Sequence, residues 1–394
     1  MIAPPWLKVP SEGYGGVEAV LDNLVKGLMD LGVDVEVFGV GNKKLHGAKV
    51  HAVTQEEQFP HILKPMYDFS LPIPSAHVLK SLEMIQQDGT FDVIHDHNYF
   101  IGPSLLSWAT RTSDIPPAVH TVHGPPVSTD DSVANGIPDN RIFWRNVAGP
   151  HDCRFVSISD AMRDSMPKEL SKNMLDTVHN AIDVSHFPFV PKEKRRNYFI
   201  TLARFSPEKG QHIAARLCAK MGYKLRMAGT VATIATSRKL MIELANPMSK
   251  YRSDRDFKYY SDRVFPYVLR HPRITFSGGL SGRKKMKFIS EAKALLFPIS
   301  WNEPFGMAVI EALACGTPVI AMRRGAMPEI IEHGVNGFLA DTVEEFAEYM
   351  QRVDEIDPAA CRKSVEDKFS AQLMAKKYLQ RYKQAIKKSA ASKK

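Results

Sequence analysis

Short apolar runs alternate with stretches of helical period along most of this 394-residue chain. In the first half, the predicted strands are residues 33–40, 92–95, 117–122 and 154–158, and the predicted helices are 17–31, 75–87 and 102–110. Continuous apolar runs of this length are typical of strands buried on both faces. The alternation therefore predicts a parallel, doubly wound α/β sheet that binds ligands at the carboxyl ends of its strands.

A second series of the same kind follows a Pro-rich and charged segment at residues 187–196. Its predicted strands are residues 198–202, 224–227, 273–276, 294–297 and 318–321, and its helices include 207–221, 283–291 and 307–315. The length of the chain also exceeds that of a usual single domain. We expect one domain over residues 1–185, a second over 186–370, and a closing helix at 371–386 within a carboxyl-terminal segment, 371–394.

The amino terminus leaves little room for a first strand. Met1, Ile2 and Ala3 run directly into Pro4 and Pro5. The first strand of this sheet is therefore expected to be very short or incomplete.

Two carboxylates flank the start of one predicted helix. Glu311 is the single polar residue within 307–315, and a carboxylate in an otherwise apolar helix needs a partner or a narrow solvent-facing stripe. Glu303 precedes that helix, whose first amides, at Phe305, Gly306 and Met307, would form an anion site. One carboxylate could then hold a vicinal diol while the other faces developing positive charge.

Two further segments could contact phosphate. Arg204 and Lys209 follow the predicted strand 198–202, where a guanidinium fork and an ammonium can clamp an anion, although surface cations are common at such junctions. Gly15 and Gly16, within the run from Gly13 to Val17, would let a ligand approach the backbone at a helix start. The spacing is not GxGxxG, so a dinucleotide site is unsupported.

Histidines end two predicted strands of the first domain. They are His95 and His97 on one strand, and His120 and His123 on the next. Paired histidines can bind a metal, but no fuller ligand set lies at close spacing, so no metal is expected and a hydrogen bond from His123 to a ligand is the preferred interpretation. Asp254 and Asp256 form a DxD pattern that we interpret as solvated surface.

The composition bears on the cellular compartment and on the partners that we expect. The four cysteines form no CxxC pair, which fits a reducing cytoplasm, and no apolar run approaches the length of a membrane span. The net charge is +9, with basic clusters at 192–196, 283–287 and 383–394. These clusters suit phosphate-bearing ligands or weak contact of the tail with an anionic membrane, although solvated surface is the simpler interpretation. No nucleic-acid-binding module is recognisable.

Together these residues resemble family 4 glycosyltransferases. The resemblance is strongest over residues 303–319, with Glu303 and Glu311 in the E-x7-E pattern, and continues through Gly325–Glu329 and Gly334–Phe338. Arg204 and Lys209 match the family's donor-phosphate pair, Gly15 and Gly16 its glycine loop, and His123 the histidine beside the transferred sugar. The family's Asn-Gly is here Asn180 and Ala181.

The resemblance implies a GT-B fold, in which two Rossmann-like domains face each other across a cleft. It also implies a retaining, metal-independent hexosyltransferase that uses no cofactor beyond its nucleotide-sugar donor. A UDP-sugar is the first expectation for the donor, with GDP- and ADP-sugars open, and the hydroxyl acceptor is not identified. Two alternatives remain: an epimerase of nucleotide sugars on the same fold, and a non-catalytic protein that binds nucleotide sugars.

Overall fold

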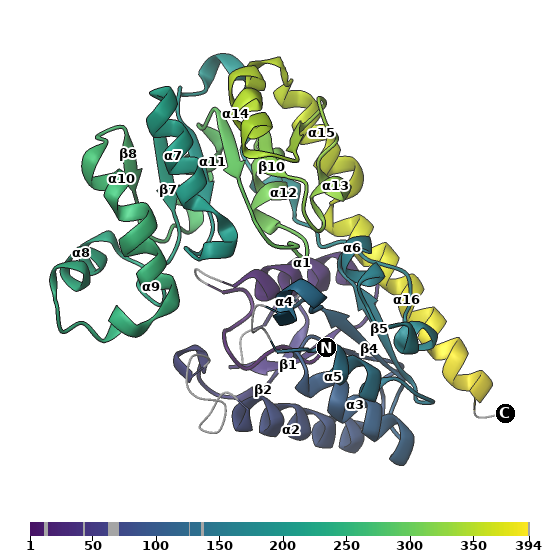
Figure 1. Ribbon diagram of the computed structural model, residues 1–394. Helices are drawn as coiled ribbons and strands as arrows, with labels where there is room; N and C mark the ends of the chain where they lie inside the picture. The colour runs from purple at the N-terminus through teal and green to yellow at the C-terminus, as the bar shows by residue number, and fades with distance from the viewer. Residues whose placement is uncertain (12–14, 42–43, 62–70, 126, 135–137, 393–394) are drawn as a thin grey trace. The chain divides into compact units, whose positions relative to one another are not determined.

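The computed structural model describes residues 1–11, 15–41, 44–61, 71–125, 127–134 and 138–392. The chain divides into two compact units (Figure 1). The amino unit contains residues 1–11, 15–182 and 371–394, and the carboxyl unit contains residues 183–370. The chain leaves the amino unit after Ile182, whereas the sequence placed the boundary at residue 185.

The amino unit is built on parallel strands: β1 (Glu36–Val40), β2 (Lys49–Thr54), β3 (Ile94–Asp96), β4 (Ala118–Val122) and β5 (Cys153–Ser157). Ile2 joins the two parts of this sheet, because it forms parallel bridges with both Phe38 of β1 and Asp96 of β3. Its amide donates to the His95 carbonyl at 2.8 Å. The expected very short first strand is therefore a single bridging residue.

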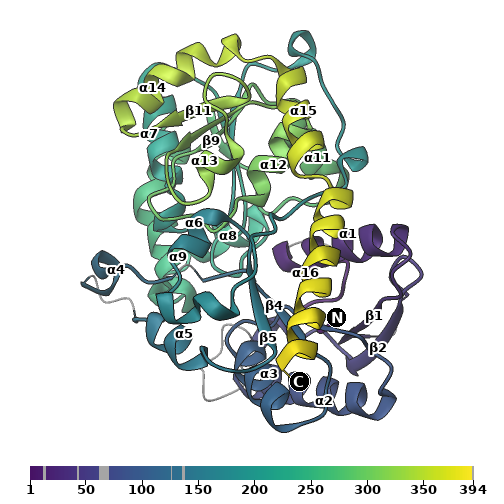
Figure 2. The same ribbon diagram turned by 90° about the vertical axis from the view of Figure 1, so that its right-hand side faces the viewer.

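The helices of this unit are α1 (Gly16–Asp30), α2 (Pro72–Asp88), α3 (Ile101–Thr112), α4 (Asp130–Ala134), α5 (Arg141–Val147), α6 (Asp160–Asp164), and the short 3-10 turns η1 (Phe59–His61) and η3 (Lys168–Asn173). The long helix α16 (Ala371–Ser392) returns to this unit and packs beside α1 (Figure 2). A side chain at Gly27 of α1 would collide with Ala375 of α16, so the absence of a Cβ permits this close approach.

Two tyrosines of α16 form hydrogen bonds with side chains of β3 and β4. Tyr382 Oη lies 2.7 Å from His95 Nδ1, and Tyr378 Oη lies 2.8 Å from Thr121 Oγ1. Both tyrosines are almost fully buried, and they lie four residues apart on one face of the helix. These hydrogen bonds fix how α16 is rotated against the ends of β3 and β4.

The carboxyl unit contains one six-stranded parallel sheet in the order β11-β10-β9-β6-β7-β8. The strands are β6 (Phe199–Leu202), β7 (Leu225–Ala228), β8 (Ile274–Phe276), β9 (Ala294–Phe297), β10 (Val319–Met322) and β11 (Gly337–Ala340). Strand order reverses between β6 and β9, which is the topological switch point where α/β sheets bind ligands. The predicted doubly wound architecture is confirmed.

The helices of the carboxyl unit are α7 (Gln211–Met221), α8 (Ser237–Ala245), α9 (Arg255–Tyr259), α10 (Phe265–Arg270), α11 (Gly282–Ser290), α12 (Met307–Ala314), α13 (Met327–Ile330), α14 (Val343–Arg352) and α15 (Pro358–Lys368). Shorter turns are η4 (Val184–His186), η5 (Lys192–Lys194), η6 (Pro207–Lys209), η7 (Lys250–Ser253), η9 (Val353–Glu355) and a π-helical turn, η8 (Tyr260–Val264). The helix predicted over 207–221 is in fact two pieces, because Gly210 adopts φ 68° and separates η6 from α7.

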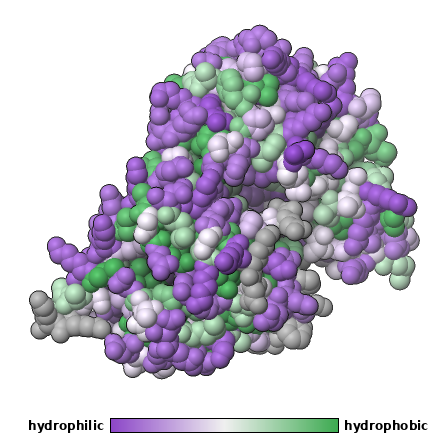
Figure 3. All heavy atoms as spheres, turned by 180° about the vertical axis from the view of Figure 1, so that it is seen from behind, coloured by the Kyte–Doolittle hydropathy of each residue, from purple (hydrophilic) through white to green (hydrophobic). Residues whose placement is uncertain are grey.

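The four cysteines are free and buried. The face drawn in Figure 3 is mostly hydrophilic, with apolar side chains in smaller groups among polar ones. Of the helices that the structure describes, none has the length and apolar character needed to cross a membrane.

Candidate functional site

Glu303 and Lys209 meet at the switch point of the carboxyl unit. Lys209 lies at the end of η6, after β6, and Glu303 lies in the loop that follows β9. Lys209 Nζ is 2.5 Å from Glu303 Oε2, and their side chains are only 15% and 11% exposed. Trp301 Nε1 donates to the same Glu303 oxygen at 2.8 Å, and its ring lies 4.6 Å from Lys209 Nζ. The two residues, 94 positions apart in sequence, thus form one part-buried charged pair.

The backbone holds these two loops together. The amide of Ser300 donates to the carbonyl of Glu208 at 2.9 Å, which ties the loop after β9 to η6. A Cβ at Gly210 would collide with the carbonyl of Pro298, and the left-handed φ of this residue also favours glycine. Lys209 is therefore positioned by backbone contacts as well as by its ion pair.

The helix α12 begins beside this pair. Gly306 caps it with φ 105°, and a side chain at Gly306 would meet Met327. Phe305 is buried with 2% exposure, and the centroid of its ring lies 5.8 Å from that of Phe369. The Phe305 side chain therefore belongs to the core. The first amides of α12, including that of Met307, have no acceptor within the helix and carry the positive end of its dipole. This helix start can bind an anion through its backbone.

Glu311 is buried in α12 and paired. Lys285 of α11 places its Nζ 2.6 Å from Glu311 Oε1, and the Glu311 side chain is 10% exposed. Burial with a partner, rather than a solvent-facing stripe, is thus the environment of this carboxylate. Lys285 was missed by the sequence reasoning, which treated it as one member of a basic cluster. The requirement that a buried carboxylate be paired was the signal that a cation should lie nearby.

Arg204 also has a carboxylate partner, and here the sequence interpretation was wrong. The polar DxD stretch predicts solvated surface, but Asp256 is buried with 7% exposure, and its Oδ2 accepts from Arg204 Nη1 at 2.5 Å. Burial raises the pKa of Asp256, and the nearby Arg204 opposes that rise. Asp254 is the N-cap of α9, accepting from the amides of Asp256 and Phe257 at 2.9 Å. The DxD segment therefore caps a helix and holds Arg204.

In the amino unit, the predicted glycine loop lies at the start of α1. Gly15 is the N-cap of this helix and Gly16 is its first residue, whereas Gly13 and Tyr14 lie outside the described residues. A Cβ at Gly15 would crowd Ser11 and Glu18, and a Cβ at Gly16 would meet no described atom within 4 Å. Packing among the described residues therefore explains a glycine at position 15 and leaves space at position 16.

Glu18, in the first turn of α1, was not singled out from the sequence. Its side chain is buried, with 5% residue exposure. Burial raises the pKa of Glu18 to about 7, and the charge of Glu57 adds to the rise. A carboxyl group that can be protonated near neutral pH thus lies next to the glycine loop.

His123 follows β4 and pairs with another histidine. Its Nε2 lies 2.9 Å from His97 Nδ1, and the two rings stack with centroids 5.2 Å apart. Burial, with a smaller contribution from the charge of His120, lowers the pKa of His123 to about 3. Its imidazole is therefore neutral at pH 7 and can donate one hydrogen bond while accepting another.

The remaining histidines of the two strand ends are bonded within the protein. His120 Nδ1 lies 2.6 Å from Asp96 Oδ2, and both side chains are almost fully buried. His95 bonds Tyr382 through Nδ1 and Thr121 through Nε2, each at 2.7 Å. Strand register pairs His120 with Asp96 and His95 with Val119, so the two histidines lie on opposite faces of the sheet. Their hydrogen bonds order the ends of β3 and β4 from both faces.

Comparison of the sequence with known protein families shows which family the chain belongs to. The model described as "Glycosyltransferase Family 4" matches residues 14–186, and that described as "Glycosyl transferases group 1" matches residues 185–365. Together they span both units. The chain therefore belongs to family 4 of the glycosyltransferases and has the GT-B fold of that family.

Relatives and solved structures agree with this assignment. The chain is 26% identical over 304 residues to D-inositol 3-phosphate glycosyltransferase of Mycolicibacterium smegmatis, a match that covers 73% of this chain and 64% of the relative. It is 24% identical to the uncharacterized glycosyltransferase MJ1607 of Methanocaldococcus jannaschii, covering 83% of this chain and 82% of the relative. The chain thus spans less than two thirds of the length of the first of these relatives.

Among solved structures, sucrose-phosphate synthase from Thermosynechococcus elongatus superposes with a TM-score of 0.70 at 20% identity, covering 97% of this chain and 98% of that one. HepE of Anabaena, solved in complex with UDP and glucose, superposes with a TM-score of 0.66 at 17% identity, with the same coverage. These two likenesses concern the fold.

Proposed function

We propose that this protein is a retaining glycosyltransferase that moves a hexosyl group from a nucleotide-sugar donor to a hydroxyl acceptor without a metal ion. The observation that carries the proposal is the cluster at the switch point: Lys209 and Glu303 beside the start of α12, with Glu311 one turn along that helix. A UDP-sugar is the first candidate for the donor, since the similar HepE structure contains UDP and glucose.

Different residues of the carboxyl unit would bind the ribose, the diphosphate and the sugar of the donor. Glu311 would bind the ribose hydroxyls by a two-pronged hydrogen bond, leaving Lys285. Arg204, Lys209 and the first amides of α12 would neutralise the departing diphosphate, taking the place of a metal ion. Glu303 would bind the donor sugar and support the positive charge that develops on it in an oxocarbenium-like transition state.

The amino unit would supply two further elements. His123, neutral at pH 7, would donate a hydrogen bond to the transferred sugar, with His97 as the partner of its other nitrogen. The amide of Gly16 would share the charge of the diphosphate at the start of α1. Retention would follow from attack on the same face, with the leaving phosphate accepting the proton of the acceptor hydroxyl.

The first experiment measures which nucleotide sugar the protein binds. A thermal-shift screen with UDP-, GDP- and ADP-sugars should show stabilisation by one nucleotide class, and UDP-sugars are expected. Turnover with an acceptor panel should yield a product whose anomeric configuration, read by NMR, matches that of the donor. The rate should persist in EDTA, and an inverted product or a strict metal requirement would overturn the mechanism.

Variants then test the residues. Lys209→Ala and Glu303→Ala should each lower kcat by at least about a hundredfold, as is typical when a group that stabilises transition-state charge is removed. Lys220→Ala and Glu344→Ala, exposed residues of the same unit, serve as matched controls and should keep nearly full activity. Donor binding without turnover by the unaltered protein would instead favour the non-catalytic alternative, and epimerised donor without acceptor would favour the epimerase.

A further inference from the structure

A pocket of about 280 Å³ lies at the amino edge of the sheet in the carboxyl unit. Asn197, Lys293 and Pro318 line it just before β6, β9 and β10 begin. Because all strands are parallel, this edge is opposite the carboxyl ends that carry Arg204 and Glu303. The pocket is therefore separate from the candidate donor site.

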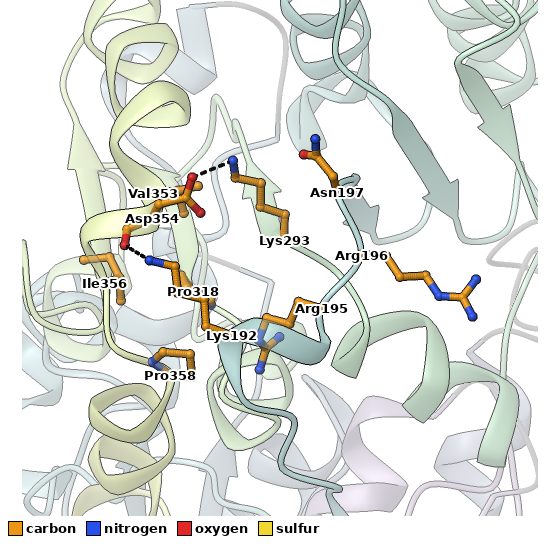
Figure 4. A pocket seen from close by; sticks show the side chains of 10 residues that line it. All are labelled: Lys192, Arg195, Arg196, Asn197, Lys293, Pro318, Val353, Asp354, Ile356 and Pro358. Atoms are coloured by element: carbon orange, nitrogen blue, oxygen red, sulfur yellow. Dashed lines mark hydrogen bonds and ion pairs between the residues drawn. The ribbon is translucent and has the colours of Figure 1, made fainter.

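Two lysines converge on one residue in this pocket, one on its carboxylate and one on its backbone carbonyl. Lys293 Nζ lies 2.8 Å from Asp354 Oδ2, and Lys192 Nζ donates to the backbone carbonyl of Asp354 at 2.6 Å (Figure 4). The Asp354 side chain is 58% exposed and lies in η9, a single short turn. A weak, exposed contact of this kind can be exchanged for another anion at little cost.

Arg195 adds a charge that no carboxylate of the described part of the chain balances. Its terminal nitrogens donate to the carbonyls of Val190, Ser290, Ala292 and Cys315 and to the Thr317 hydroxyl, at 2.5 to 3.1 Å. Among the residues that the structure describes, Arg195 has no ion pair, and its buried Nε has no hydrogen-bond partner. A half-buried cation with only neutral partners leaves a local excess of positive charge.

The other charged group at the rim is already neutralised. Arg196 turns its guanidinium away from the two lysines and pairs with Glu291 at 3.1 Å (Figure 4). Of the described residues that line the pocket, the charges left to face it are Lys192, Lys293 and Arg195 against Asp354. The basic cluster at 192–196 thus places part of its charge at a cavity instead of on an open solvated face.

Apolar side chains also line the pocket. They are Pro318, Val353, Ile356 and Pro358. A lining of cationic and apolar side chains suits a small ligand that has an anionic head and a carbon skeleton. Inorganic phosphate would use the cationic side chains only, whereas a phosphate monoester would use both kinds.

We propose that this pocket binds a phosphate group, independently of the nucleotide-sugar donor. Lys293 exchanges the Asp354 carboxylate for the phosphate, and the Asp354 side chain moves toward solvent. Lys192 turns from the backbone carbonyl of Asp354 to the same phosphate. Arg195 supplies the fixed charge beneath them and, through its bonds to carbonyls before β9 and β10, connects the ligand to the base of the sheet. This site goes beyond the proposed function and does not depend on it.

Calorimetric titration of the full chain tests the proposal, with inorganic phosphate and glycerol 3-phosphate as probes. Lys209→Ala forms the background, so that phosphate contacts at the donor site are weakened. In that background, the double variant Lys192→Met/Lys293→Met should bind both probes at least tenfold more weakly. The exposed pair Lys220→Met/Lys376→Met is the control and should leave affinity unchanged.

Asp354→Asn should tighten phosphate binding several-fold, because it removes the competing charge and keeps the side-chain volume. Tighter binding of glycerol 3-phosphate than of phosphate identifies a monoester as the ligand, and equal affinities identify free phosphate. Equal affinity of the Lys192/Lys293 variant and the control would overturn the proposal. The variant Lys192→Met/Lys293→Met with Lys209 intact should still bind UDP. Loss of UDP binding would also overturn the proposal, because the pocket would then not be independent of the donor site.

Discussion

The part-buried pair of Lys209 and Glu303 offers a direct test of whether its opposite charges stabilise the candidate site. The two side chains are 15% and 11% exposed, and Trp301 donates to the same carboxylate. Removing one member of a fully buried pair destabilises a protein by about 3–5 kcal/mol, whereas an exposed pair contributes about 0.2–1 kcal/mol. At this intermediate burial, Lys209→Met or Glu303→Gln alone should lower the unfolding free energy of the carboxyl unit by about 2 kcal/mol.

The double variant separates charge pairing from other effects. In Lys209→Met/Glu303→Gln neither side chain is charged, so no unpaired charge remains, and the amide oxygen introduced by Glu303→Gln can still accept from Trp301. We expect the double variant to lose much less than the sum of the single variants, giving a coupling free energy of about 2 kcal/mol. Activity should not recover, because both groups are assigned to the donor.

Trp301 provides a local probe for this measurement. Of the four tryptophans in the sequence, it is the one that falls within residues 183–370. The fluorine resonance of 5-fluorotryptophan at position 301, followed during urea unfolding, would therefore report on the carboxyl unit alone. Coupling below about 0.5 kcal/mol would refute the charge-pairing argument, and recovery of activity in the double variant would refute the assigned roles.

Three further predictions follow from other residues. Asp256→Asn should lower the Kd for UDP about threefold, as measured by calorimetry, because a neutral side chain competes less with phosphate for Arg204. Weaker UDP binding would show instead that Asp256 holds Arg204 in the position that binds the donor. Glu18 has a folded pKa of about 7 against an ordinary 4.5, so the folded state binds more protons between these values and stability falls as pH rises through that window. Glu18→Gln should therefore stabilise the amino unit at pH 8 by up to about 3 kcal/mol and have little effect at pH 4, and equal melting shifts at both pH values would contradict this. Tyr382→Phe removes the partner of His95 Nδ1 and should lower the unfolding free energy by about 1–2 kcal/mol in urea titration, while an unchanged midpoint would show that water replaces the hydroxyl.

Much of the sheet was predictable because parallel strands buried on both faces leave continuous apolar runs in the sequence. Predicted strands at 117–122 and 294–297 correspond to β4 and β9. The two strands that were missed, β2 and β11, both lie at sheet edges. Residues of β2 are exposed or half-buried, so this strand shows no continuous apolar run. β11 is buried, but it begins at Gly337, and a glycine weakens the strand signal of its short apolar run.

The site was predictable where it depends on strand order and not where it depends on helix placement. Lys209 and Glu303 follow neighbouring strands, so their loops meet at one edge of the sheet. Asp256 belongs instead to the helical segment between β7 and β8, and its approach to Arg204 depends on how Phe257 and Tyr260 pack in the core. A short DxD pattern in a polar stretch carries no signal of that packing.

The cations of the candidate donor site all have carboxylate partners in this structure. The pairs are Lys209–Glu303, Arg204–Asp256 and Lys285–Glu311. A diphosphate entering such a site does not meet free charges; it exchanges partners with carboxylates, two of which are themselves assigned to sugar and ribose hydroxyls. Donor binding should then change few counterions, and the affinity for UDP should fall only weakly with salt compared with a site of unpaired cations. The exchange also favours a complete donor over inorganic phosphate, because only the complete donor gives the displaced Glu303 and Glu311 new hydrogen-bond partners.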